Sequence, residues 1–364
     1  MSMRDQITSK CYVVEKQKVG HNIQLLRQRA GGRIIYAVLK ANGYGLGCTE
    51  MAKLCSEHGL RRFAVTELCD AEKIAASGVP VDELLLLTSA FPHEIDRLVE
   101  LGVTFTVASE EDAENLSGRQ VRAHVKVDTG MSRRGFLAED PSAIAAVYEN
   151  YPDIQFTGIY THFSNGGDRK GTKVQFDRFC GVLQTLEERG IAPGIRHCCS
   201  SPAILGDESM LLDGIRVGSA LLGRFSDTLH MGFQRTGVCY VPVESVRQIP
   251  KGAQVGYSGL FTAKRATTTA LCPLGLHNGF GQSYIMGKVR PGVDLFQTLS
   301  AIRKRIRGDG IPGGVLGGHR CKALGIIGSE IAILDVTGVP CKRGDLVEFD
   351  INPLMLNDME VEYV

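Results

Sequence analysis

The sequence lacks any apolar run that could cross a membrane. Uninterrupted apolar stretches such as Leu84–Leu87 fall far short of the roughly 20 residues that a transmembrane helix needs. The first residues, Met1–Lys18, mix charged and apolar side chains, so we expect no signal peptide. Net charge is also nearly absent, because 41 lysines and arginines balance 40 aspartates and glutamates to leave +1. That balance predicts neither a nucleic-acid partner nor a membrane partner.

Paired cysteine motifs are missing as well. The eleven cysteines form no CxxC pair, and the one adjacent pair is Cys198-Cys199. In a chain of 364 residues this scatter favours a reducing cytoplasm over a disulfide framework. Zinc-ligand spacing is absent too, since His319 and Cys321 stand without a second pair, so we expect no metal site.

What is present is a regular alternation of apolar, strand-like runs with amphipathic helical segments. Eight such strands alternating with helices indicate an α/β fold, an N-terminal (β/α)8 TIM-like barrel over residues 1–231. The rival, a doubly wound sheet, would be favoured by GxGxxG after the first strand, and that motif is absent there. The eight predicted strands are Arg33–Lys40, Arg62–Thr66, Glu83–Thr88, Thr104–Ser109, Val121–Asp128, Phe156–His162, Ile195–Ser201 and Gly214–Ser219.

Residues 232–364 have a different texture. β-rich runs such as Gly237–Val241 and Leu346–Phe349 alternate with turn signals, and a helical pattern appears only at Val293–Arg305. This predicts a C-terminal domain that is mostly antiparallel β-structure.

Polar residues follow the carboxyl ends of the predicted barrel strands, where barrel enzymes carry their chemistry. The first strand ends on Lys40, an amine that an aldehyde cofactor could hold as a Schiff base. Ser201, Gly218 and Ser219 follow the last two strands, a usual phosphate site of this architecture. Together these residues indicate pyridoxal 5'-phosphate. Each residue alone has a plainer interpretation, such as a solvated lysine stem or a helix N-cap.

At these residues the chain resembles the alanine racemase family. Ala37–Gly47 is similar to the family's cofactor-lysine motif, which implies a covalent bond to Lys40 and a phosphate contact from Tyr44. The segment Lys126–Arg133 resembles the fifth-strand motif. It implies that Lys126, carbamylated in some members, orients Arg133 toward the substrate carboxylate. Gln254–Gly259 is similar to the motif that carries a catalytic tyrosine, here Tyr257.

The resemblance implies further roles. His162 and Arg216 would bind the cofactor and join Tyr257 in a hydrogen-bonded chain, with Arg216 facing the pyridine nitrogen, and His197 would support them. Lys40 and Tyr257 would then be two bases on opposite faces of the substrate, as racemisation at Cα requires. The resemblance also implies a homodimer in which one subunit's Tyr257 completes the other's active site.

Some positions depart from the family. Leu276 stands where a tyrosine is usual, and Ser329-Glu330, with Ser329 assigned to substrate binding, replaces a Met-Asp pair. These changes leave alanine, serine, lysine and ornithine open as substrates. A decarboxylase, a metal-assisted aldolase or a non-catalytic carrier of pyridoxal phosphate are the alternatives. The long second domain with Tyr257 argues against a carrier, whose relatives are barrels alone.

Overall fold

The structure is a computed structural model that describes residues 7–224, 231–257, 261–282 and 312–364. The chain divides into two compact units. One is the barrel unit, Lys16–Thr236, and the other is the β unit, formed by residues up to Glu15 together with Gly237–Val364. The helix expected at Val293–Arg305 lies outside the described residues. In the described residues no helix is both long and apolar enough to traverse a bilayer.

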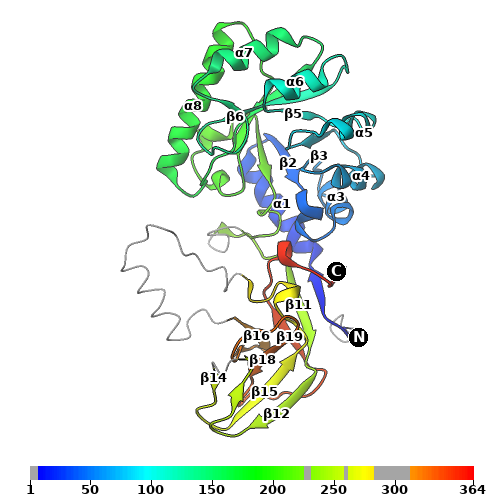
Figure 1. The fold of residues 1–364 in the computed structure, drawn as a ribbon, viewed down its shortest axis with the longest axis vertical. Coiled ribbons are helices and arrows are strands. Elements are labelled where there is room, and N and C mark those ends of the chain that lie inside the picture. The colour runs from blue at the N-terminus through cyan, green and yellow to red at the C-terminus, as the bar shows by residue number, and fades with distance from the viewer. Residues whose placement is uncertain (1–6, 225–230, 258–260, 283–311) are drawn as a thin grey trace. The chain divides into compact units, whose positions relative to one another are not determined.

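The barrel unit contains the eight parallel strands that the sequence predicts (Figure 1). They follow one another in the order β4-β3-β2-β10-β9-β8-β6-β5, and the short strand β7 (Phe136–Leu137) pairs with β6 off this path. Backbone bonds join the two ends of this order, because Thr104 just before β5 donates to Leu84 and accepts from Leu86 of β4. The predicted (β/α)8 barrel is therefore confirmed. Its strands are β2 (Ile34–Val38), β3 (Arg62–Val65), β4 (Glu83–Leu86), β5 (Phe105–Val107), β6 (Arg122–Asp128), β8 (Gln155–Tyr160), β9 (Ile195–Cys199) and β10 (Gly214–Val217).

Helices connect these strands, and local sequence signals set their ends. The side chains of Ser109, Asp140 and Asp168 accept backbone N–H groups at the starts of three helices, as N-caps do. Glycines at positive φ follow four helices at residues 59, 78, 102 and 190, where the sequence predicts C-caps. The helices are α1 (Lys16–Ala30), α3 (Cys48–Glu57), α4 (Leu68–Ala76), α5 (Ile95–Glu100), α6 (Glu110–Leu116), α7 (Pro141–Asn150) and α8 (Arg169–Glu188).

The strand nearest the start of the chain belongs to the β unit and not to the barrel unit. The expected division, 1–231 and 232–364, placed this strand with the barrel. β1 (Cys11–Val14) pairs antiparallel with β11 (Gly237–Pro242) and parallel with β20 (Glu360–Tyr363). Both partners lie far along the chain, so local sequence could not reveal them. The observed boundaries fall after Glu15 and after Thr236.

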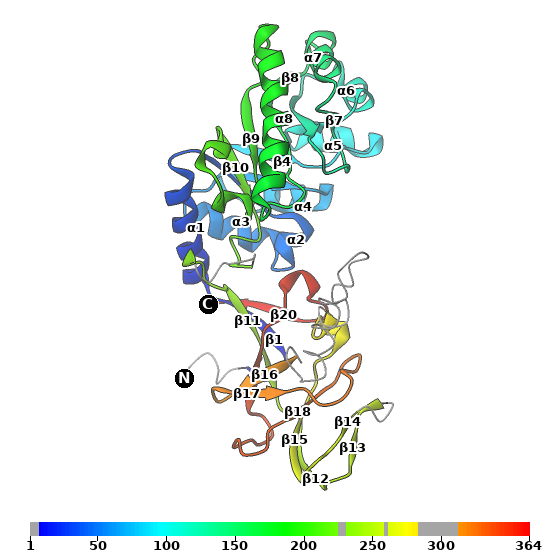
Figure 2. The ribbon, with the colours of Figure 1, turned by 90° about the vertical axis from the view of Figure 1, so that its left-hand side faces the viewer.

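The rest of the β unit is mostly antiparallel, as predicted (Figure 2). One sheet has the order β17-β16-β19-β11-β1-β20, a second has the order β12-β15-β18, and β13 pairs with β14. The remaining strands are β12 (Ser245–Ile249), β13 (Gln254–Val255), β14 (Phe261–Thr262), β15 (Thr267–Cys272), β16 (Gly313–Leu316), β17 (His319–Lys322), β18 (Ala332–Asp335) and β19 (Leu346–Phe349). All eleven cysteines of the chain are described and unpaired.

Large side chains fill the barrel interior, and one glycine makes room for them. His124 of β6 lies directly opposite Gly158 of β8 in the strand register. A Cβ atom at position 158 would lie 2.7 Å from the His124 ring, which is fully buried. Position 158 must therefore be a glycine for the His124 ring to fit.

Gly158→Ala should destabilise the fold by about 1–3 kcal/mol, because the added methyl group overpacks a rigid interior. The matched control is Gly181→Ala in α8, where a Cβ meets nothing within 4 Å. That control should stabilise the fold by about 0.5–1 kcal/mol. Thermal unfolding of both variants would measure the difference. Equal midpoints would contradict the packing assigned to His124.

Candidate active site

A cavity of about 510 Å3 opens at the carboxyl ends of the barrel strands. It gathers nine of the residues that the sequence predicts for the site, from five separate strand ends. Those residues are Lys40, Tyr44, Lys126, Arg133, His162, Ser201, Arg216, Gly218 and Ser219. His197 is fully buried below them. The placement of polar side chains at one rim is therefore as predicted.

The cavity is strongly basic. Among the described residues that line it, five side chains are lysine or arginine and none is an aspartate or glutamate. An uncompensated group of positive charges attracts anions and disfavours protonation of its lysines. The five are Lys40, Lys126, Arg133, Arg134 and Arg216. A phosphate and a carboxylate are the ligands that this charge suits.

The prediction that the first barrel strand ends on Lys40 is wrong. β2 stops at Val38, and Lys40 opens a short turn, α2 (Lys40–Tyr44), whose next residues are left-handed. The φ angles of Ala41 and Asn42 are both 53°, a conformation that costs a non-glycine residue about 1–2 kcal/mol. Such cost concentrates at functional sites.

Polar contacts hold this turn. The backbone N–H of Asn42 donates to the Asp70 carboxylate at 3.0 Å, and the Asn42 side-chain oxygen accepts from the N–H of Cys48 at 3.2 Å. The turn points Lys40 into the cavity, where burial and then the charge of Arg133 lower the pKa of its amine. In the described part of the chain, this amine has no hydrogen-bond or ion-pair partner. It is therefore available to a ligand.

Tyr44, Gly218 and Ser201 form a cradle at one end of the cavity. A Cβ at position 218 would lie 2.1 Å from the Tyr44 hydroxyl, so only glycine allows this approach. Burial raises the pKa of Tyr44 to about 12, which keeps its phenol protonated and able to donate. The Ser201 hydroxyl accepts from the N–H groups of Gly218 and Ala220, each at 3.2 Å, and fixes the loop after β10. Hydroxyls and backbone N–H groups of this kind bind phosphate.

Asp128 organises the loop that carries Arg133, a role that was not predicted from the sequence. One carboxylate oxygen accepts from the N–H groups of Gly130, Met131 and Ser132, and the other accepts from the N–H of Arg133 at 2.9 Å. Burial opposes ionisation of Asp128, but these four donors lower its pKa. A strand-ending aspartate followed by Thr-Gly is the signal that could have identified it.

Lys126 is a buried amine at the floor of the cavity. Its Nζ donates to the Val127 carbonyl at 2.9 Å. Burial, and then the charge of Arg216, lower its pKa well below the usual value. A neutral amine is the form that reacts with CO2, so the carbamylation implied by the resemblance is chemically accessible here.

Arg216 lies at the centre of the site with His162 and His197 on either side. Its Nη1 lies 2.8 Å from Nδ1 of His197, and its Nη2 lies 3.3 Å from Nδ1 of His162. Nη2 also donates to the Thr161 carbonyl at 2.6 Å. Burial, and then the charge of Arg216, lower the pKa of His162 to about 2, so this ring is neutral. The contact expected between His162 and Arg216 is present.

The β unit carries the other two predicted residues. Tyr257 lies two residues after the end of β13, and 74% of it is exposed. Ser329 is exposed, and the backbone N–H of His277 donates to its carbonyl at 2.8 Å. The neighbouring Leu276 donates to the carbonyl of Gly328 at 2.9 Å. The two departures from the family pattern, at 276 and 329, are therefore side by side in space.

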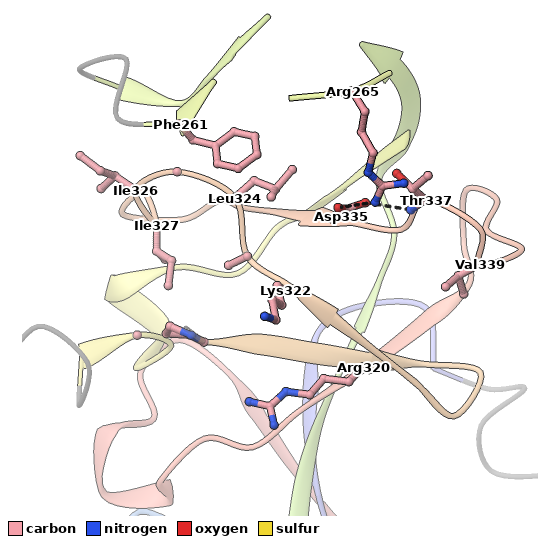
Figure 3. Close-up of a pocket in the computed structure, with 14 residues that line it drawn as sticks. Phe261, Arg265, Arg320, Lys322, Leu324, Ile326, Ile327, Asp335, Thr337 and Val339 are labelled. Atoms are coloured by element: carbon pink, nitrogen blue, oxygen red, sulfur yellow. Dashed lines mark hydrogen bonds and ion pairs between the residues drawn. The ribbon is translucent and has the colours of Figure 1, made fainter. Parts of the chain in front are cut away.

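A second cavity, of about 670 Å3, lies in the β unit (Figure 3). Phe261, Leu324 and Ile327 form its apolar part, and Arg265 pairs with Asp335 at 3.3 Å. It contains none of the predicted site residues. Among the described residues, no group of three or more His, Cys, Asp or Glu could hold a metal ion. The barrel cavity is therefore the candidate active site.

Comparisons with known proteins identify the family of this chain. The family model described as "Alanine racemase, N-terminal domain" matches residues 14–225, and "Alanine racemase, C-terminal domain" matches residues 239–354. The alanine racemase of Desulforamulus reducens is 33% identical over 300 residues, which cover 76% of this chain and 80% of the relative. That of Methanococcus maripaludis is 32% identical over 291 residues, which cover 76% and 78%.

Solved structures show the same fold. The alanine racemase from Streptomyces coelicolor A3(2) has a TM-score of 0.84 and 20% identity, covering 99% of each chain. The biosynthetic alanine racemase from Pseudomonas aeruginosa has a TM-score of 0.82 and 21% identity, covering 98% of this chain and 100% of the other. With both family models matched and relatives above 30% identity over most of their length, the chain belongs to the alanine racemase family.

Proposed function

We propose that this chain is a pyridoxal-phosphate-dependent amino-acid racemase, with alanine as the first candidate substrate. By family it is an isomerase. The observation that carries the proposal is the basic cavity, where Lys40 stands among four other basic side chains. In the described residues its amine has no hydrogen-bond or ion-pair partner and lies over the Tyr44 ring, and the described lining contains no acidic residue. These residues fit an anionic aldehyde that accepts an amine and carries a phosphate.

Each part of the cofactor has residues that would hold it. Lys40 would bind it covalently, and Tyr44, Ser201, Gly218 and Ser219 would receive its phosphate. The Nη atoms of Arg216 are engaged by His162, His197 and backbone carbonyls, so its Nε is the N–H left to face the ring nitrogen. When bound, pyridoxal phosphate withdraws electrons from the substrate and acidifies its Cα proton.

Two side chains would move that proton. Lys40 would exchange it on one face of the substrate, because its lowered pKa makes the neutral amine accessible. Tyr257 would exchange it on the other face. His162 receives an Arg216 N–H at Nδ1, so its own proton lies on Nε2 and can be donated to the Tyr257 oxygen. Such a donor favours the phenolate, the form of tyrosine that acts as a base.

Arg133 would bind the substrate carboxylate. Asp128 fixes the backbone at Arg133, and the guanidinium reaches the cavity from that loop. A planar guanidinium suits a carboxylate because it can donate two parallel N–H groups. Ser329 and its neighbours in the β unit would influence which substrate side chain the enzyme accepts. Alanine, serine, lysine and ornithine all remain candidates, and Glu330 could pair with a cationic one.

We further propose a cytoplasmic homodimer in which Tyr257 of one subunit serves the barrel of the other. Eleven unpaired cysteines suit a reducing compartment. An exposed tyrosine on the second unit suits a role toward another subunit.

The activity should appear as exchange of the Cα proton with solvent. The purified holoenzyme in deuterium oxide should incorporate deuterium into both enantiomers of its substrate, followed by NMR over a panel of L- and D-amino acids. Lys40→Ala should abolish the exchange and, after borohydride reduction, the cofactor label on the Lys40 peptide. A carrier would retain the label without exchange of any amino acid, and a decarboxylase or aldolase would consume the amino acid.

Shared active sites predict complementation between two inactive variants. Co-expressed Lys40→Ala and Tyr257→Phe subunits, carrying different tags, should form mixed dimers with one intact site in two. Random pairing should then give about a quarter of the wild-type activity, because half of the dimers are mixed. If each barrel used its own Tyr257, no mixed dimer would hold an intact site and the mixture would remain inactive.

Asp128→Asn should weaken substrate binding through Arg133. The change removes the charge from a carboxylate that accepts four N–H groups, and bonds to a charged group are worth about 1.5–3 kcal/mol. We expect KM to rise roughly tenfold while cofactor content stays near wild type, since 1.4 kcal/mol is a factor of ten. Asp140→Asn, which changes an N-cap of α7, is the matched control. An unchanged KM in Asp128→Asn would refute this account of the loop.

A further inference from the structure

A chain of buried side chains runs from Arg216 into the interior of the barrel. Nε2 of His197 lies 3.0 Å from Nδ1 of His124, and Nε2 of His124 lies 3.1 Å from a carboxylate oxygen of Glu83. The second contact has the distance of an ion pair without the alignment of a hydrogen bond. All three residues are buried on separate strands, at 0%, 0% and 3% exposure.

The donors in this chain fix its direction. A guanidinium has only donors, so Nδ1 of His197 must accept from Arg216 and must lack a proton. The neutral His197 ring then carries its proton on Nε2 and donates to Nδ1 of His124. By the same reasoning His124 carries its proton on Nε2, facing Glu83. Every link therefore points from the guanidinium toward the carboxylate.

Glu83 is anionic at the far end. Burial would raise the pKa of its carboxyl, but contacts with His124, Tyr36 and Arg62 lower it to about 2. The Tyr36 hydroxyl donates to Oε2 of Glu83 at 2.7 Å, and Nη1 of Arg62 lies 2.6 Å from the same oxygen. In the described residues, Arg216 has carbonyl and imidazole partners and no directly bound carboxylate.

The neighbouring residues pack closely around the rings of His197 and His124. His197 is stacked between Tyr36 and Tyr160, with ring centroids 5.1 Å and 4.9 Å away. The glycine at 158 clears space for the His124 ring. Interiors of such barrels are usually filled by branched apolar side chains, so a buried polar chain here needs a reason.

We infer that Glu83 and His124 are positioning residues that act through His197 to hold Arg216 in a single orientation, its Nε toward the cofactor ring. The bonds from Arg216 to His197 and from His197 to His124 polarise one another, and the Glu83 carboxylate lies 3.1 Å from the His124 ring at their end. Both rings are held in one tautomer, as outer partners hold metal-bound histidines. The role of Arg216 toward the cofactor rests on the proposed function, whereas the tautomers and their origin do not.

The tautomers can be observed in the protein by nitrogen NMR of 15N-histidine, with and without pyridoxal phosphate. We expect His197 and His124 both to be neutral and protonated on Nε2. Glu83→Gln should leave His197 protonated on Nε2, because Arg216 still donates to its Nδ1. Detection of His197 protonated on Nδ1 in the wild type would overturn the inference without any measurement of activity.

Two substitutions at position 124 distinguish the loss of the hydrogen-bonded chain from the loss of packing. His124→Gln keeps an acceptor toward His197 and a donor toward Glu83, whereas His124→Leu fills space without either. The Leu variant should leave the Nε2–H of His197 without its acceptor and lower kcat about 10–100-fold, the range for lost outer partners, with KM nearly unchanged. The Gln variant should keep that acceptor and a kcat near that of the wild type. Thr104→Val, which removes a buried hydroxyl outside the chain, controls for a general effect of barrel mutations.

The outcomes distinguish this inference from the proposed function. Both rings protonated on Nε2 in a protein that racemises nothing would uphold the chain and refute the racemase. Racemase activity with the same kcat in wild type and His124→Leu would refute the chain and uphold the racemase.

Discussion

The repulsion among positive charges at the rim of the barrel is the constraint on which the site depends. Five cationic side chains share one cavity without an acid in its described lining. Lowered pKa values at Lys40 and Lys126 follow from burial and from neighbouring arginines. The molecule tolerates this arrangement because an anionic ligand would relieve it. The same charges would then hold a phosphate and a carboxylate in place.

Much of this design could be predicted from local sequence. Each barrel strand is a short apolar run ending in polar residues, so both the fold and the rim residues followed from periodicity and strand ends. The glycines after Lys40 predicted a tight turn, and three of them have positive φ. The family motifs added Tyr257 and Arg133, which no local pattern would have selected.

What could not be predicted depends on contacts between distant residues. The place of β1 in the β unit follows only from its partners β11 and β20, which lie far along the chain. Glu83 and His124 look like polar interruptions of apolar strands, and their meaning appears only when four strands bring them together with His197 and Arg216. The left-handed turn at Ala41 and Asn42 is held by Asp70 of α4, which accepts from the backbone N–H of Asn42. Residue type alone would have argued against it.

The pairing of β1 has a consequence for the order in which the chain assembles. This strand is made before the barrel unit, yet both of its neighbours in the sheet are made after the whole barrel unit. The barrel can therefore close during synthesis before β1 has a sheet to join. Nascent molecules would pass through a stage in which β1 has unpaired edges, and the edge that faces β20 stays unpaired until residue 363 is made.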